Sequence, residues 1–296
     1  MDAWIIYTLG AVVFQTARFM LQKVMASSGL SAGGATMARF VYSAPIVWVV
    51  TAIILADWPS FGAGYWLYAV AGGLAQILGT VCVVLLFQSR NFAVGITLKK
   101  SEVLLTVLVG IVILGEGVSW AGFAAMVLGV LGVLFLSDPP KVEGASWWSI
   151  LTGRAVVLGV VSGLFFAISA VSYRGATLAV EGEPWLRALI ALSGVLLVQN
   201  LCLGAWLLVR EPGEITRVAK AWRRASWIGL TSLGGSFCWF SAFSLQNAGY
   251  VFALGQLEVI LSLFASVLFF HERVTRKEVV GITLITVSVI ALVAVT

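Results

Sequence analysis

The chain has 296 residues, of which 60% are hydrophobic and 10% are charged, and its formal net charge is +5. Its mean hydropathy is +1.04. Because a soluble domain carries about 25% charged residues, this composition excludes a soluble globular domain, a disordered chain and a nucleic-acid-binding protein.

Ten apolar runs are long enough for membrane-spanning helices, each of which needs about 20 mostly apolar residues. The runs lack the period-2 alternation of membrane strands, so we predict an all-α integral membrane protein with ten transmembrane helices. The first run follows Asp2 and not a basic region, which favours a retained helix over a signal peptide. The predicted spans are 3–23, 36–56, 64–87, 92–115, 118–136, 154–177, 185–209, 226–246, 249–271 and 276–295.

The connections between the predicted spans are mostly short, and the longest polar one lies at the midpoint of the chain. We interpret residues 138–153 as a linker between two halves, 1–137 and 154–296, with five spans each. An odd number of spans gives the two halves opposite orientations in the membrane. Such inverted repeats suit transport by alternating access.

The two halves also share residues at a constant offset of 156. Glu102 matches Glu258, Glu116 matches Glu272, and Arg18 matches Arg174 at this offset. The chain has 13 acidic residues, so two acidic matches at one offset are informative where apolar matches would not be. The second helices of the halves need another offset, 148, at which Arg39 matches Arg187.

Lys and Arg are unequally divided between the two sides of the predicted membrane. The connections that follow spans 1, 3, 5, 7 and 9 hold most of them, whereas the other side has only Arg174 and Arg187. The positive-inside rule places the basic side in the cytoplasm. Both termini are therefore expected on the non-cytoplasmic side.

The repeat carries a signature that resembles a known family. The first half reads LKKSEVLLT at 98–106 and LGE at 114–116, and the second reads LEVILS at 257–262 and FHERV at 270–274. Both resemble the EamA-type branch of the drug/metabolite transporter superfamily. The resemblance implies two inverted five-helix repeats, a location in the bacterial inner membrane, and a substrate path surrounded by helices 1, 3, 4, 6, 8 and 9.

Ionisable residues inside predicted spans are costly and are candidates for function. Glu102 and Glu258 would either line the transport path or stabilise the bundle through hydrogen bonds and ion pairs. Lys99 and Lys100 occur in the first half only, because Gly255 and Gln256 stand at the matching positions. These lysines would either attract a carboxylate or phosphate of a substrate, or pair with Glu102 on the same helix face.

The predicted substrate cavity adds polar and aromatic residues on helices that the resemblance places around the path. Its members are Gln15, Gln76, Lys99, Lys100, Glu102, Tyr173, Trp239, Gln256 and Glu258. No catalytic constellation is visible. The three cysteines lie in apolar runs and His271 is the single histidine, so neither a metal site nor a cofactor is expected.

These observations predict a secondary transporter of small metabolites that is not an enzyme, and an amino-acid exporter is the first expectation. One alternative is a transporter of sugar phosphates or nucleotide sugars, which would need several basic groups converging at mid-depth. An alternative of another class is a lipid-modifying membrane protein. The expected partners are a small-molecule substrate and the lipid bilayer, with no nucleic acid; the sequence leaves the oligomeric state open and is compatible with a monomer.

Overall fold

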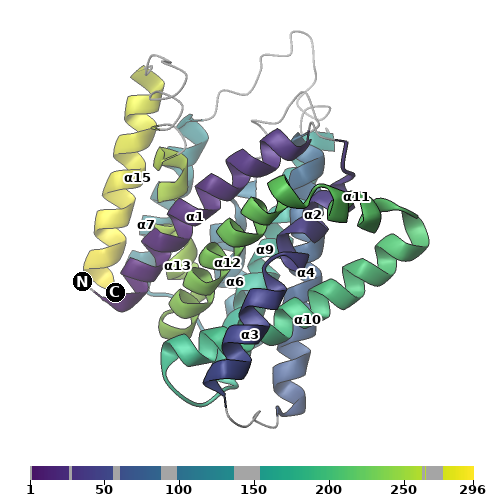
Figure 1. Cartoon of the computed structure of the whole chain (residues 1–296). Coiled ribbons are helices and arrows are strands. Elements are labelled where there is room, and N and C mark those ends of the chain that lie inside the picture. Colours follow the sequence, from purple (N-terminus) through teal and green to yellow (C-terminus); the bar gives the residue numbers. More distant parts are fainter. Residues whose placement is uncertain are drawn as a thin grey trace.

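The computed structural model describes residues 2–26, 29–55, 61–87, 99–136, 154–261, 264 and 276–296, and every regular element in these ranges is helical (Figure 1). The helices are α1 (Ala3–Ala26), α2 (Ala32–Val41), α3 (Ala44–Ile54), α4 (Ala63–Phe87), α6 (Glu102–Leu114), α7 (Trp120–Leu136), α9 (Arg154–Leu178), α10 (Pro184–Arg210), α11 (Glu214–Lys220), α12 (Trp222–Leu245), α13 (Ala248–Leu254) and α15 (Arg276–Val295).

Seven helical segments in the described residues are long and apolar enough to cross a membrane, and each coincides with one predicted span. The other three predicted spans fall on shorter apolar helices, Glu102–Leu114, Trp120–Leu136 and Ala248–Leu261. Each of these three borders residues outside the described ranges. The membrane-protein fold is therefore confirmed, and the layout of ten spans in two repeats stays a prediction.

Turns interrupt several of the predicted helices within the described residues, among them the second and the ninth. The second predicted span divides into α2 and α3 at Tyr42 and Ser43, next to Pro45 in the first turn of α3. Proline lacks a backbone N–H and disfavours helical geometry in the residue before it. The ninth span is interrupted by a turn at Gly255 and Gln256. Neither break was predicted, because the spans were identified from the length of the apolar runs, and apolar residues resume after each break.

The helices pack in pairs that join distant parts of the chain. Helix α1 packs along α12, α4 packs along α9, and α7 packs along α15. Between α4 and α9 the contact is reciprocal: a Cβ on Gly72 would lie 2.7 Å from Cε1 of Tyr173, and one on Gly175 would lie 2.7 Å from Cδ1 of Tyr68. Each glycine thus lets the facing tyrosine ring lie on the backbone, the close approach that small residues permit between membrane helices.

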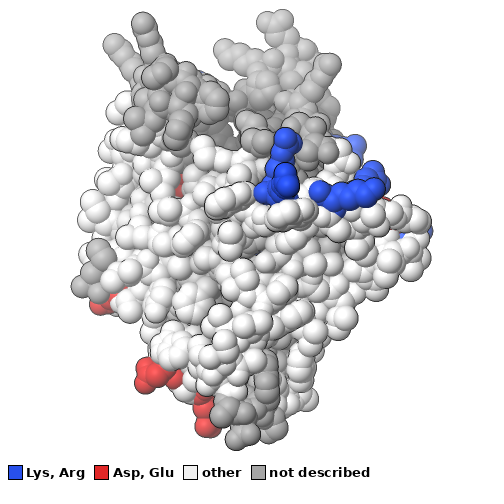
Figure 2. Space-filling model, viewed as in Figure 1, with Lys and Arg blue, Asp and Glu red and all other residues white. Residues whose placement is uncertain are grey.

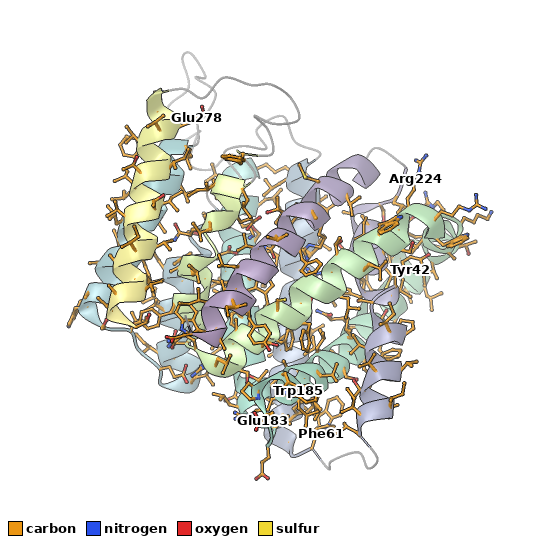
Figure 3. All side chains as sticks on the ribbon, turned by 60° about the vertical axis from the view of Figure 1, so that its left-hand side comes forward. Tyr42, Phe61, Glu183, Trp185, Arg224 and Glu278 are labelled. Atoms are coloured by element: carbon orange, nitrogen blue, oxygen red, sulfur yellow. The ribbon has the colours of Figure 1, made fainter. Side chains whose placement is uncertain are left out.

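The two ends of the helix bundle differ in charge. On the face drawn in Figure 2, Lys and Arg gather toward the upper end and most acidic side chains lie toward the lower end. Figure 3 places Arg224 toward the upper end and Glu183, Phe61 and Trp185 toward the lower end. The exposed basic side chains of this region are Arg210, Arg217, Lys220, Arg223 and Arg224.

Candidate functional site

Two adjoining pockets lie in the interior of the bundle, and both are lined by polar side chains. The first, the arginine pocket, is lined by Gln15, Arg18, Arg39, Gln76, Phe166, Ser169, Ala170, Tyr173, Ser236, Trp239, Phe240, Phe243 and Phe252. The second, the lysine pocket, is lined by Gln15, Arg18, Phe19, Lys99, Lys100, Glu102, Phe166, Trp239, Phe252, Gly255 and Glu258. Since five residues line both, we treat the pockets as one polar cavity.

Both lysines of the signature are held in ion pairs. Lys99 Nζ lies 2.9 Å from Glu102 Oε2, and Lys100 Nζ lies 2.7 Å from Glu258 Oε2. The four residues are between 3% and 6% exposed, so both pairs are buried. The first pair is the i, i+3 contact that the sequence offered as one alternative, and the second joins the two halves of the chain.

Gln15 on α1 connects the carboxylate of Glu258 to the arginine pocket. Its Nε2 donates to Glu258 Oε2 at 2.9 Å. Its Oε1 accepts from Trp239 Nε1 at 3.1 Å and from Arg18 Nη2 at 3.3 Å. Residues predicted from four different spans therefore meet in one hydrogen-bonded network.

A second network includes two residues that line the arginine pocket, Gln76 and Tyr173. Gln76 Oε1 on α4 accepts from the Tyr173 hydroxyl at 2.9 Å and from Gln199 Nε2 at 2.7 Å. Gln199 on α10 is 1% exposed and also donates to the Tyr173 hydroxyl at 3.1 Å. Gln76 and Tyr173 were predicted, whereas Gln199 was not, because it lies in the seventh predicted span, which the resemblance does not place around the path.

Gln256 differs from the other predicted residues in that it lines neither pocket. It is 1% exposed, and its side chain lies beside Gly129 of α7, close to Ser288 of α15. Neither its Nε2 nor its Oε1 has a hydrogen-bond partner within the described ranges. The turn at Gly255 and Gln256 directs this side chain away from the cavity while Glu258, two residues later, faces it.

Arg18 and Arg39 line the cavity, and the predicted set of cavity residues did not include them. The sequence analysis used these arginines only to align the two halves. An arginine inside an apolar span is nevertheless a candidate for function, because its charge is costly in the membrane. Each is 3% exposed, and both line the arginine pocket. Four buried cations (Arg18, Arg39, Lys99 and Lys100) thus surround the cavity with two carboxylates (Glu102 and Glu258), which leaves an excess of two positive charges among the described residues.

The cavity is nearly closed in this conformation. The space open to water-sized molecules is about 30 Å³ in the arginine pocket and about 20 Å³ in the lysine pocket. A water needs roughly 10–15 Å³ measured in this way. The cavity has room for a few waters but not for a sugar or an amino acid, so a substrate of that size requires the helices to move apart.

A third ion pair lies outside the cavity, after the end of α6. Arg174 on α9 donates to both carboxylate oxygens of Glu116, at 2.5 and 2.8 Å, and its Nη1 also donates to the carbonyl oxygens of Phe243 and Gln246. Asn247 Nδ2 approaches the same carboxylate at 3.4 Å. Arg174 thereby ties α9 to the loop after α6 and to the end of α12.

Comparison with known proteins agrees with this architecture. The profile of the EamA-like transporter family matches residues 153–294. Two proteins from strains of Pseudomonas aeruginosa, each described as a probable 4-amino-4-deoxy-L-arabinose-phosphoundecaprenol flippase subunit ArnE, are 30% identical over 95 residues and 29% identical over 92 residues. These matches cover 32% and 31% of this chain, and 80% and 77% of the relatives.

One solved crystal structure has the same fold, with a TM-score of 0.72 over 98% of this chain and 96% of that one, at 13% sequence identity. At that identity the likeness concerns the fold alone. The family profile and the sequence relatives go further and confirm the resemblance read from the repeated signature. The chain belongs to the drug/metabolite transporter superfamily, in its EamA-type branch.

Proposed function

We propose that this protein moves a small phosphate-bearing metabolite, a sugar phosphate in soluble or lipid-linked form, across the membrane through the polar cavity. The observation that carries the proposal is the excess of two buried positive charges around the cavity. A buried charge without a counter-charge is strongly unfavourable. A substrate that brings negative charge would offset this cost when it binds.

The charge balance favours a phosphate-bearing substrate over the amino acids expected first from the sequence. A zwitterionic amino acid has no net charge and would leave the excess in place. The alternative of sugar phosphates required several basic groups converging in the membrane, and Arg18 and Arg39 supply the two that the sequence reasoning did not count. The relatives in Pseudomonas aeruginosa carry a name that includes a phosphate-linked sugar, which supports the same class of substrate.

Alternating access is the mechanism that we propose for this movement. It is supported by the packing, because α1 lies on α12 and α4 lies on α9. At the offset of 156, α1 corresponds to α9 and α4 corresponds to α12, so the two contacts are equivalent in the two halves. It is also supported by one repeated hydrogen bond: Val103 N donates to Lys100 O, and Val259 N donates to Gln256 O, at positions that differ by 156. A closed cavity between such related halves would open to one side at a time.

Flux measurements in proteoliposomes test this function. We expect uptake of labelled glucose 6-phosphate to exceed uptake of glucose and of leucine. Glucose is the same sugar without the phosphate, and leucine represents the zwitterionic amino acids. A separate arm follows a fluorescent sugar-phosphate polyprenol between leaflets, which distinguishes a lipid-linked substrate from a soluble one. Transport of leucine with no movement of either phosphate-bearing compound would contradict the proposal and restore amino-acid export.

A further inference from the structure

We infer that Arg18 and Arg39 form a two-arginine clamp for the phosphoryl group of the substrate, and that Lys99 and Lys100 are not its direct ligands. The inference rests on the proposed function and assigns the anion to the arginine pocket. It differs from the expectation read from the sequence, in which the lysines were the candidates for binding a carboxylate or phosphate.

The four cations differ in how their charges are balanced. Lys99 and Lys100 each have a carboxylate within 3 Å. Among the described residues no carboxylate forms a salt bridge with Arg18 or Arg39. Arg18 donates to the neutral side chain of Gln15, and Arg39 donates to the Thr80 hydroxyl at 3.2 Å. The Nε atoms of both arginines have no hydrogen-bond partner in the part of the chain that the structure describes.

The two guanidinium groups are suited to an oxyanion by chemistry and by placement. A guanidinium presents five N–H donors in a planar fork that matches phosphate oxygens in pairs. The Arg18 guanidinium carbon lies 4.6 Å from the centre of the Phe19 ring, and that of Arg39 lies 5.4 Å from the centre of the Phe40 ring. These contacts support the guanidinium groups without using their hydrogen-bond donors.

The charge of a phosphate monoester matches the excess in the pocket. Such a group carries about −1.5 to −2 at neutral pH. Arg18 and Arg39 line the same small pocket, so their like charges repel each other. A phosphate monoester between the two arginines would replace that repulsion with two attractive contacts, whereas a carboxylate, or the phosphodiester of a lipid-linked sugar, would offset one charge only.

The remainder of the arginine pocket suits the uncharged part of a sugar phosphate. Trp239 stacks on Phe243 with ring centres 5.8 Å apart and meets Phe252 edge to face at 5.4 Å. Aromatic surfaces of this kind pack against the apolar faces of a sugar ring. Gln76 and the Tyr173 hydroxyl line the same pocket and are polar groups that can form hydrogen bonds to the hydroxyl groups of the sugar.

The first experiment measures the thermal stability of the purified, ligand-free protein in detergent. Arg39→Met and Arg18→Met keep most of the side-chain volume and remove an unbalanced buried charge, so we expect each to raise the melting temperature by a few degrees. Arg223→Met removes an exposed arginine and should change it little. A fall as large as that caused by Lys100→Met would show that the arginines are structural, and would overturn the clamp.

The second experiment measures equilibrium binding of inorganic phosphate and glucose 6-phosphate by calorimetry. Arg18→Gln and Arg39→Gln should each weaken binding of both at least tenfold. Arg39→Lys and Arg18→Lys, which keep the charge but lose the planar fork, should show an intermediate loss and stand in if either glutamine variant does not fold. Arg223→Gln, which changes the net charge equally, should bind as the wild type does.

The outcomes separate the clamp from the proposed function. Wild-type binding of phosphate that persists unchanged in the Arg18 and Arg39 variants would overturn the clamp and leave a phosphate-bearing substrate in place. Wild-type preference for glucose or succinate over glucose 6-phosphate would overturn the proposed function, and the clamp with it. Loss of phosphate binding in the Arg18 and Arg39 variants, with binding retained in Arg223→Gln, supports both the clamp and the proposed function.

Discussion

Lys100 and Glu258 connect the two halves of the chain through a buried ion pair, with Nζ and Oε2 2.7 Å apart. At the offset of 156 the counterpart of Lys100 is Gln256 and the counterpart of Glu258 is Glu102. The lysine of the first half therefore serves a carboxylate of the second half, while Lys99 serves Glu102 within the first. One half supplies the cations and each half supplies one carboxylate.

Removing one partner of this pair should destabilise the protein strongly. Lys100→Met leaves Glu258 buried with Gln15 as its neighbour on α1, and loss of one member of a buried ion pair costs about 3–5 kcal/mol. We expect a lower melting temperature in detergent for the single variant. The double variant Lys100→Met/Glu258→Gln should recover part of the loss, because no charge is then left alone; a double variant as unstable as the two single losses added together would refute this coupling.

Gly163 sets the distance between α9 and the residues before α6. A Cβ on this glycine would lie 2.8 Å from the carbonyl oxygen of Lys99 and 3.0 Å from Ser101 Oγ, and the first of these is backbone that cannot turn aside. Gly163→Ala should therefore cost about 1–3 kcal/mol of unfolding free energy, as overpacking does. Gly64→Ala is the matched control, because no atom lies within 4 Å of a Cβ there; equal melting temperatures for the two variants would contradict the prediction.

The Arg174 cluster predicts an order of effects. Arg174→Gln removes the ion pair with Glu116 and the hydrogen bonds to the carbonyl oxygens of Phe243 and Gln246. Glu116→Gln leaves those two carbonyl contacts and an amide oxygen that can still accept from Arg174. Thermal unfolding should therefore show a larger loss for Arg174→Gln, and the reverse order would mean that the carboxylate, not the arginine, holds α9 to α12.

Orientation in the membrane can be tested by cysteine labelling in a background without Cys82, Cys202 and Cys238. The basic end of the bundle predicts that Lys220→Cys faces the cytoplasm and that Thr296→Cys faces away from it. An impermeant maleimide added to intact cells should label the second variant and not the first until the membrane is opened. Labelling of Lys220→Cys in intact cells, with Thr296→Cys protected, would reverse the orientation.

The sequence predicted what depends on composition and on position along a helix. Apolar run length predicted the helical segments, and the acidic matches at one offset identified Glu102 and Glu258, which both reach the cavity. It did not predict side-chain direction where helices break. The turn at Gly255 and Gln256 directs the Gln256 side chain away from the cavity, and the periodicity of the sequence does not predict such a turn.

The arginines show a different limit. The sequence showed that Arg18 and Arg39 are charged residues in apolar spans. Whether a carboxylate forms a salt bridge with them depends on how the helices pack in three dimensions. Only the packing of the helices reveals that Arg18 donates to Gln15 and Arg39 to Thr80, and that neither forms a salt bridge with a carboxylate among the described residues. A sequence shows how many charged residues lie in apolar spans, but which of these charges are paired with one another can be read only from the fold.

The cross-pairing of helices also bears on how such a protein could be assembled from separate gene products. Because α1 lies along α12 and α4 along α9, neither half contains its own main packing partners. Each half made alone would leave the glycine faces of Gly72 or Gly175 without the tyrosine rings that cover them. Two separate polypeptides, divided within 138–153, would have to find each other as an obligate heterodimer, and the single chain fixes their one-to-one ratio.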